Sequence, residues 1–142
     1  MGLRFEGLDE PEVELHELNI LVVGCGGGGC NSIHRLNLLG IEAATTIAIN
    51  TDQKSLKATE CPNRLLLGVE YTKGLGTGGR PDIGEECALN AAPMLSKLFQ
   101  GVDLTFIVTG LVVIGWFARL ALTVAPRNGT VAEGRGRAAT RR

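Results

Sequence analysis

The stretch Asn19–Asn31, NILVVGCGGGGCN, joins a short apolar run to a block of four consecutive glycines. The run ending at Gly24 is wholly apolar after its first residue, which predicts a buried β-strand. Glycine costs about 0.5–1 kcal/mol more than alanine in regular structure, so four in succession indicate a backbone requirement that no side chain can meet. Asn31 or Ser32 is then expected to cap a helix that stops at Gly40. The apolar side of that helix would consist of Ile33, Leu36, Leu38 and Leu39.

A strand, a glycine-rich turn and the start of a helix form an arrangement that suits phosphate binding. Free N–H groups at a helix N-terminus carry about half a positive charge. Glycine allows positive φ and lets a phosphate approach without meeting a Cβ atom. The candidate ligands of a di- or triphosphate are Gly26, Gly27, Gly28, Gly29 and Asn31. The alternative is a plain tight turn, for which one or two glycines would be enough.

The glycine block can be set against two known nucleotide-binding motifs, the P-loop and G-x-G-x-x-G. A P-loop is excluded because no Gly-Lys-Ser/Thr follows the glycines. Gly24, Gly26 and Gly29 satisfy G-x-G-x-x-G, and Asp52 stands where a ribose-binding acid is expected. An NAD- or FAD-binding oxidoreductase domain is therefore an open alternative.

The rest of the chain alternates between short apolar runs and helical patterns. Further strands are expected at 45–50, 64–68 and 103–110. A short helix or turn is expected after Asp52, and a longer helix from Pro81 to about Phe99 that Pro93 interrupts. Apolar strands without alternation predict an α/β fold, with a Rossmann-like parallel sheet covered by helices on both faces.

Three of these strands are followed by polar or glycine-rich exits, GCGGGGCN, NTD and GLGTGGRP. Ligands in open α/β sheets bind outside the carboxyl ends of the strands. We therefore expect the three exits to line one shared pocket.

The four motifs ILVVGCGGGGCNSIHRL, AINTDQKSL, TKGLGTGGRPDIGEECA and GVDLTFIVTG resemble, in order and spacing, the nucleotide-binding part of FtsZ, the tubulin-like cell-division GTPase. The resemblance covers about Asn19 to Gly110, and Cys25 and Cys30 beside the glycines look like archaeal members. It implies GTP or GDP as ligand with Mg²⁺, self-association into protofilaments, division-ring anchoring proteins as partners, and a cytoplasmic place at midcell.

The resemblance also implies roles for individual residues. Gly26 to Gly29 and Asn31 would form the first phosphate loop. Asn50 and Asp52 would stand near the phosphates and their magnesium, although Asp52 would equally serve as a helix N-cap. Thr77, Gly78 and Gly79 would sense the γ-phosphate, with a mobile surface loop as the alternative.

The resemblance breaks after Gly110, where the family continues with a GGGTGTG loop. This chain instead reads LVVIGWFARL, with bulky residues from Val112 to Phe117 in place of small ones. The family's catalytic carboxylate loop also has no counterpart in these 142 residues. No catalytic residue is nominated, and we expect weak or absent GTP binding and no turnover by this chain alone.

Charge divides the chain at the same point. Residues 1–110 hold eight Lys and Arg against fourteen Asp and Glu, whereas residues 111–142 hold six Arg and one Glu. This predicts an acidic arm at 1–18, a nucleotide-binding domain at 19–110 and a poorly ordered basic tail at 111–142. The tail has no aromatic pattern typical of nucleic-acid binding, and the longest uncharged run has only fifteen residues, so neither nucleic acid nor membrane insertion is expected. The four cysteines are expected to be reduced thiols, and no metal site is expected from their spacing.

Overall fold

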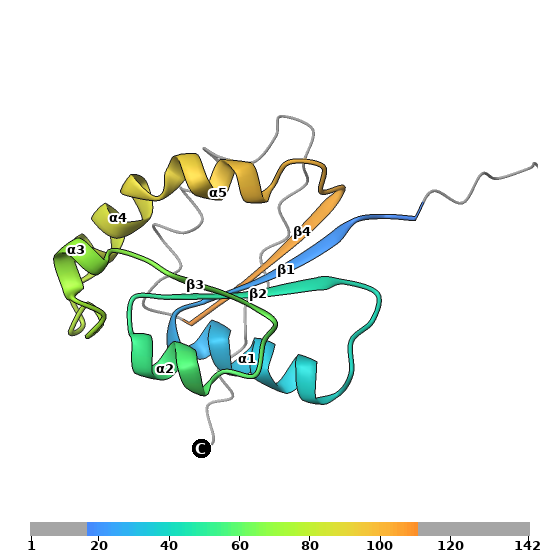
Figure 1. The fold of residues 1–142 in the computed structure, drawn as a ribbon, viewed down its shortest axis with the longest axis horizontal. Helices are drawn as coiled ribbons and strands as arrows, with labels where there is room; N and C mark the ends of the chain where they lie inside the picture. Colours follow the sequence, from blue (N-terminus) through green and yellow to red (C-terminus); the bar gives the residue numbers. More distant parts are fainter. Residues whose placement is uncertain (1–16, 111–142) are drawn as a thin grey trace, which may run out of the picture.

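The computed structural model describes residues 17–110, in which strands and helices alternate (Figure 1). The strands are β1 (Ile20–Cys25), β2 (Thr45–Asn50), β3 (Asn63–Leu66) and β4 (Leu104–Thr109). The helices are α1 (Gly26–Leu38), α2 (Gln53–Ala58), α3 (Val69–Thr72), α4 (Pro81–Asn90) and α5 (Ala92–Leu98). The expected basic tail, and the acidic arm apart from its last two residues, lie outside the described part.

All strand pairs are parallel, in the order β3-β2-β1-β4. β1 is therefore central, with β2 on one side and β4 on the other. The chain moves outward from β1 to β3 and then returns to place β4 on the opposite side. The point where the strand order reverses is the usual place for a ligand crevice in open α/β sheets. The predicted α/β class and parallel sheet are confirmed.

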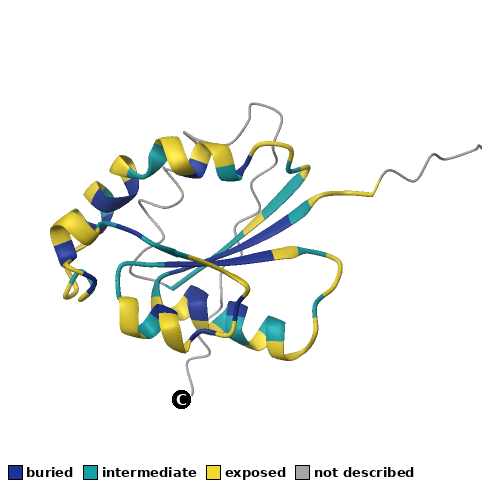
Figure 2. Ribbon diagram, in the orientation of Figure 1, coloured by how far each residue is buried: buried dark blue, intermediate teal, exposed yellow. Residues whose placement is uncertain are grey.

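Helices cover both faces of the sheet, so each strand sends alternate residues into two separate cores. The core under α4 and α5 contains Leu21, Val23, Cys25, Ile47, Ile49, Leu67, Cys87, Ala88, Leu95 and Phe99. The core under α1 and α2 contains Val22, Cys30, Ile33, Ala48, Leu56 and Cys61. Figure 2 shows the buried residues along the middle of the sheet and on the inner sides of the helices. Burying one side chain such as the fully enclosed Ile33 contributes about 1.5–3 kcal/mol.

Helix α1 begins earlier than the sequence predicts. Its first residue is Gly26, and Asn31 lies exposed inside the helix, so neither Asn31 nor Ser32 caps it. The low helix propensity of glycine is overridden here by close packing against the sheet. The predicted apolar side of the helix is also wrong at two residues. Leu38 is 65% exposed, and Leu39, at the C-cap, is 84% exposed. Both lie where the helix ends, before Gly40 in the left-handed region.

The second half of the described chain follows the expectations more closely. Residues from Pro81 onward form α4 and α5, which meet at Ala91 with Pro93 in the first turn of α5. The short helix α3 was not expected from the sequence. Within residues 17–110, no helix is long and apolar enough to cross a membrane.

Candidate phosphate-binding site

A pocket of about 400 Å³ opens at the carboxyl ends of the strands. Its walls come from the exits of β1 and β2, from the glycine-rich loop before α4 and from the first turn of α4. Of the residues proposed from the sequence, it brings together Gly26, Gly27, Asn50, Asp52, Thr77, Gly78 and Gly79. The volume falls in the range of small-molecule sites. Three chain segments far apart in the sequence therefore share one cavity.

The four glycines of the first loop have different surroundings. Gly26 takes a φ of +69°, which turns the chain from β1 into α1, and Gly26 and Gly27 line the pocket. Gly28 and Gly29 do not line it. A Cβ on Gly28 would stand 3.2 Å from the Cα of Gly110, at the exit of β4. Gly29 is buried against β4, so its lack of a side chain serves the packing of the helix on the sheet.

Asn50 holds the second loop in shape. Its Oδ1 accepts hydrogen bonds from the backbone N–H groups of Thr51 (2.8 Å) and Asp52 (3.2 Å). Its Nδ2 donates to the Ser55 hydroxyl at 3.5 Å and to the Cys30 thiol at 3.9 Å. Both ends of the amide are thus engaged within the protein, which fixes the backbone that follows β2.

Asp52 caps helix α2. One carboxylate oxygen, Oδ1, accepts the N–H of Ser55 at 3.0 Å. The other, Oδ2, faces Gly76 of the third loop, because a Cβ added at Gly76 would lie 3.8 Å from it. The N-cap role weighed from the sequence is confirmed. The half-buried carboxylate also lines the pocket.

The third loop is tied to the second by its first half. The N–H of Gln53 donates to the Gly74 carbonyl at 2.9 Å, and the N–H of Gly76 donates to the Thr51 carbonyl at 3.2 Å. The following residues, Thr77 to Gly79, line the pocket, and a Cβ on Gly78 or Gly79 would meet nothing within 4 Å. The loop therefore has a fixed base and open backbone facing the cavity.

Several residues that line the pocket were not predicted as site residues, and two of them, Ser55 and Arg80, carry side chains able to bind a phosphate. Ser55 reaches the pocket from the first turn of α2, and Arg80 reaches it from the N-cap of α4. Both stand inside quoted motifs. Their spacing in the sequence does not indicate a ligand-binding role, because the two residues reach the cavity only through the folding of the loops.

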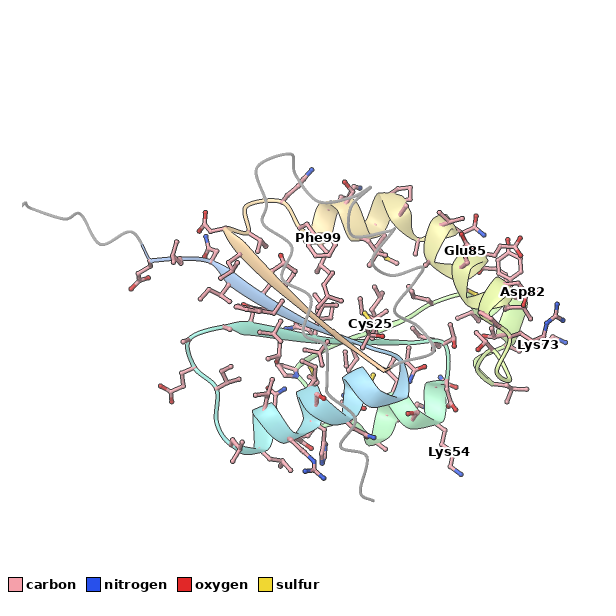
Figure 3. The ribbon with its side chains drawn as sticks, turned by 180° about the vertical axis from the view of Figure 1, so that it is seen from behind. Cys25, Lys54, Lys73, Asp82, Glu85 and Phe99 are labelled. Carbon is pink, nitrogen blue, oxygen red and sulfur yellow. The ribbon has the colours of Figure 1, made fainter. Side chains whose placement is uncertain are left out.

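The cysteines near the site, Cys25 and Cys30, are poorly placed to act as nucleophiles. All four are free and buried. Burial raises the pKa of the Cys25 thiol well above its ordinary value, and it also raises the pKa of Cys30 and of Cys87. Thiols that stay protonated are poor nucleophiles and poor metal ligands. Figure 3 shows Cys25 at the centre of the molecule, on the same side of the sheet as Phe99.

The donor set fits a magnesium ion held mainly by phosphates. Within residues 17–110 no group of three or more His, Cys, Asp or Glu side chains could hold a metal by itself. Mg²⁺ usually keeps several waters and uses one or two carboxylates together with substrate phosphates. Asp52 offers one such carboxylate inside the pocket. This carboxylate could be one ligand of a magnesium ion, and the ion would neutralise part of the charge on any phosphates that it accompanied.

The four-stranded parallel sheet, its helices on both faces and its glycine-rich edge define a Rossmann-like α/β domain. The model of the "Tubulin/FtsZ family, GTPase domain" matches residues 19–112, and the chain therefore belongs to that family. This membership argues against the alternative of an NAD- or FAD-binding oxidoreductase domain.

Individual relatives are archaeal. The chain is 45% identical over 98 residues to cell division protein FtsZ 2 of Methanocaldococcus jannaschii, which covers 69% of this chain and 26% of the relative. A solved FtsZ dimer from M. jannaschii, described as empty, has a TM-score of 0.70 and 39% identity, and the match covers 78% of this chain and 34% of that one. This chain thus spans about a quarter to a third of the length of these relatives.

A more distant structure shares the fold alone. CetZ2 from Haloferax volcanii, solved as a protofilament with GTPγS bound, has a TM-score of 0.60 and 21% identity, with 80% of this chain covered and 39% of that one.

Proposed function

We propose that the pocket binds the phosphates of GTP or GDP together with Mg²⁺. The observation that carries the proposal is the meeting of three loops at one sheet edge, with Gly26 and Gly27 on one wall and Thr77 to Gly79 on another. The backbone there is uncovered by side chains, and Asp52 supplies the carboxylate for the metal. Gly28, Gly29 and Asn31 do not line the cavity. Their role as phosphate ligands therefore stays a prediction from the sequence, without support from the pocket. Asn50 would act through the shape of the second loop.

The proposal extends to assembly, by family membership. Solved relatives include an FtsZ dimer and a CetZ2 protofilament with GTPγS bound. A longer protein containing this domain would polymerise through such contacts, hydrolyse GTP, and work in the cytoplasm at midcell with division-ring anchoring proteins. The proposed domain boundaries are 1–18, 19–110 and 111–142.

This chain alone is proposed to bind GTP weakly and to lack turnover. The sequence from 111 to 117 replaces the glycine–threonine loop of the family with Leu, Val, Ile, Trp and Phe side chains. Bulky residues cannot present the backbone N–H groups that a phosphate loop needs. Phosphoryl transfer also requires a residue that positions the attacking water, and none is nominated here.

The binding proposal is tested by titrating the ¹⁵N-labelled full chain with GTP, GDP and NADH. The amide signals of Gly26, Gly27 and Thr77 to Gly79 should shift with both guanine nucleotides and not with NADH. Signals at the opposite end of the sheet, such as those of Glu42 and Thr45, should stay in place because they lie outside the pocket. Equal shifts with NADH, or none in these loops, would refute guanine-nucleotide binding here.

Phosphate release from GTP should stay at the buffer background as the protein concentration rises. The reason is the lack of a water-positioning carboxylate, which a longer family member would supply. The assay measures inorganic phosphate over a range of chain concentrations. A rate that increases with concentration would show that this chain completes a catalytic site.

Replacing Asp52 by asparagine should separate its two roles. Asparagine caps helices about as well as aspartate, so the free energy of unfolding should change by less than about 0.5 kcal/mol. The gain in GTP affinity on adding Mg²⁺ should disappear, because the amide is a poor magnesium ligand compared with a carboxylate. Titrations with Mg²⁺ and with EDTA measure this. An Asp52→Asn chain that keeps the full Mg²⁺ effect would leave Asp52 with the capping role only.

A further inference from the structure

Arg80 is the one cationic side chain that lines the pocket within the described residues, and Asp52 is the one anionic side chain. The backbone of Arg80 is fixed at the junction of the third loop and α4. The N–H of Arg80 donates to the Thr77 carbonyl at 3.1 Å, and Pro81 begins the helix directly after it. The base of the side chain is therefore held, while its long stem leaves the guanidinium able to change direction.

In this structure the guanidinium is paired with Asp82. Nη2 lies 2.7 Å from Oδ2 and Nε lies 3.4 Å from Oδ1. The two side chains are 66% and 63% exposed. An exposed ion pair of this kind contributes little to stability, because water screens the charges and holding both side chains costs entropy. The pair is therefore easy to break.

The hydrogen bond from Arg80 is the main cause that lowers the pKa of the Asp82 carboxyl, but Asp82 also has a second source of stabilisation. It lies in the first turn of α4, where a negative charge interacts favourably with the helix N-terminus. The nearby backbone N–H of Ile83 also helps to lower the pKa of the Asp82 carboxyl. Figure 3 shows Asp82 at the outer end of α4, away from the core around Cys25. Losing the guanidinium would leave Asp82 solvated and still in the first turn of α4.

The charges around the cavity disfavour binding of a polyanion while Arg80 is paired with Asp82. Asp52 and Asp82 carry two negative charges, against the single positive charge of Arg80. A phosphate offers the guanidinium a bidentate, charge-assisted contact in a partly enclosed pocket, which is stronger than its exposed contact with Asp82. The ligand thus competes with Asp82 for the same cation.

We propose that Arg80 exchanges Asp82 for a phosphate of the ligand, and that this exchange makes the pocket prefer a triphosphate to a diphosphate. The inference rests on the proposed nucleotide function and names the group that sets its selectivity. A triphosphate carries one more negative charge than a diphosphate at neutral pH, so the contribution of the one pocket cation grows with the charge of the ligand. Asp82 acts as a competitor that keeps the cation occupied until the ligand arrives.

The test uses the full chain and variants Arg80→Ala, Arg80→Lys and Asp82→Asn, titrated with GTP, GDP and tripolyphosphate in EDTA and in Mg²⁺. Loss of one charge-assisted contact corresponds to about a tenfold fall in affinity, and Arg80→Ala should show this for GTP and less for GDP. Arg80→Lys should fall between, because an ammonium lacks the planar fork. Asp82→Asn should bind GTP tighter. The losses should persist in EDTA, which separates Arg80 from the metal.

Arg64→Ala is the matched control. It removes the same charge from β3, at a position outside this pocket where the guanidinium donates to the Lys57 carbonyl. Its affinities should equal those of the unmodified chain. Thermal unfolding midpoints should agree among all variants, so that changes in affinity are not changes in folding.

The outcomes separate this inference from the nucleotide proposal. If GTP binds normally and Arg80→Ala keeps the same preference for GTP over GDP, the function stands and the exchange is wrong. If Arg80→Ala and Asp82→Asn change affinity in the same direction, the pair is a structural contact and the exchange is wrong. If tripolyphosphate binding depends on Arg80 while GTP does not bind, the exchange stands and the guanine-nucleotide function fails. Binding of neither ligand overturns both.

Discussion

The Gly29→Ala chain is expected to lose most of its stability or fail to fold. A Cβ at this position would collide with the Val108 carbonyl oxygen of β4 and stand 2.8 Å from the Gly24 carbonyl carbon of β1. Both obstacles are backbone atoms of the paired strands β1 and β4, so neither moves without disturbing the sheet. We expect a loss of at least about 3 kcal/mol, at the upper end for overpacked sites. Urea denaturation followed by circular dichroism measures it.

Gly27→Ala is the matched control within the same helix turn. A Cβ there would meet nothing within 4 Å, and φ is not positive. Alanine in a helix should raise stability by about 0.5–1 kcal/mol relative to glycine. Because Gly27 lines the pocket, the same change should weaken GTP binding. If Gly29→Ala is as stable as Gly27→Ala, then Gly29 is not required for the packing of α1 on the sheet.

This pair of variants shows what the sequence could predict about the glycine block. The expectation that the backbone needs glycine there agrees with the structure, but the reason differs along the block. Gly26 and Gly27 face the pocket, whereas Gly29 permits a helix to lie directly on two strands. A run of glycines in a sequence does not show which members touch a ligand and which touch the fold. Only the packing of α1 against β4 decides that.

Strand positions were predictable because a parallel sheet covered on both faces requires uninterrupted apolar runs. The run at 45–50 coincides with β2, and the runs at 19–24 and 103–110 contain or overlap β1 and β4. Helix limits were harder, since propensity competes with tertiary contact. The four-residue helix α3 carries too short a pattern to detect, and Leu39 is apolar yet exposed where α1 ends.

The sequence was enough to predict which loops form the site, but not which side chains of those loops face the cavity. Parallel strands bring their exits to one edge, which places Asp52 and Thr77 in the same cavity. Asn50 also lies there, but its amide is engaged by Thr51, Asp52, Ser55 and Cys30. Arg80 enters the cavity because α4 starts directly after the third loop. The directions of these side chains depend on hydrogen bonds between the loops. Residue spacing in the sequence does not predict those hydrogen bonds.

Gly68→Ala is expected to cost about 3 kcal/mol through two effects that act together. Gly68 connects β3 to α3 with a φ of +62°, where an L-residue is strained by about 1–2 kcal/mol. A Cβ there would also collide with the Cys87 sulfur and stand 2.7 Å from its Cβ, on the buried side of α4. The close approach of Cys87 therefore leaves no room for a side chain at position 68.

Gly40→Ala separates the two effects, because Gly40 has a φ of +78° and open space where the Cβ would be. It should lose only the strain, about 1–2 kcal/mol. Adding Cys87→Gly to Gly68→Ala removes both colliding atoms, so the double variant should lose less than the sum of the two single changes. Chemical denaturation of the four variants gives the coupling. If Gly68→Ala loses no more stability than Gly40→Ala, the close approach of Cys87 to Gly68 adds nothing to the cost, and the side chain of Cys87 moves aside for the new methyl group.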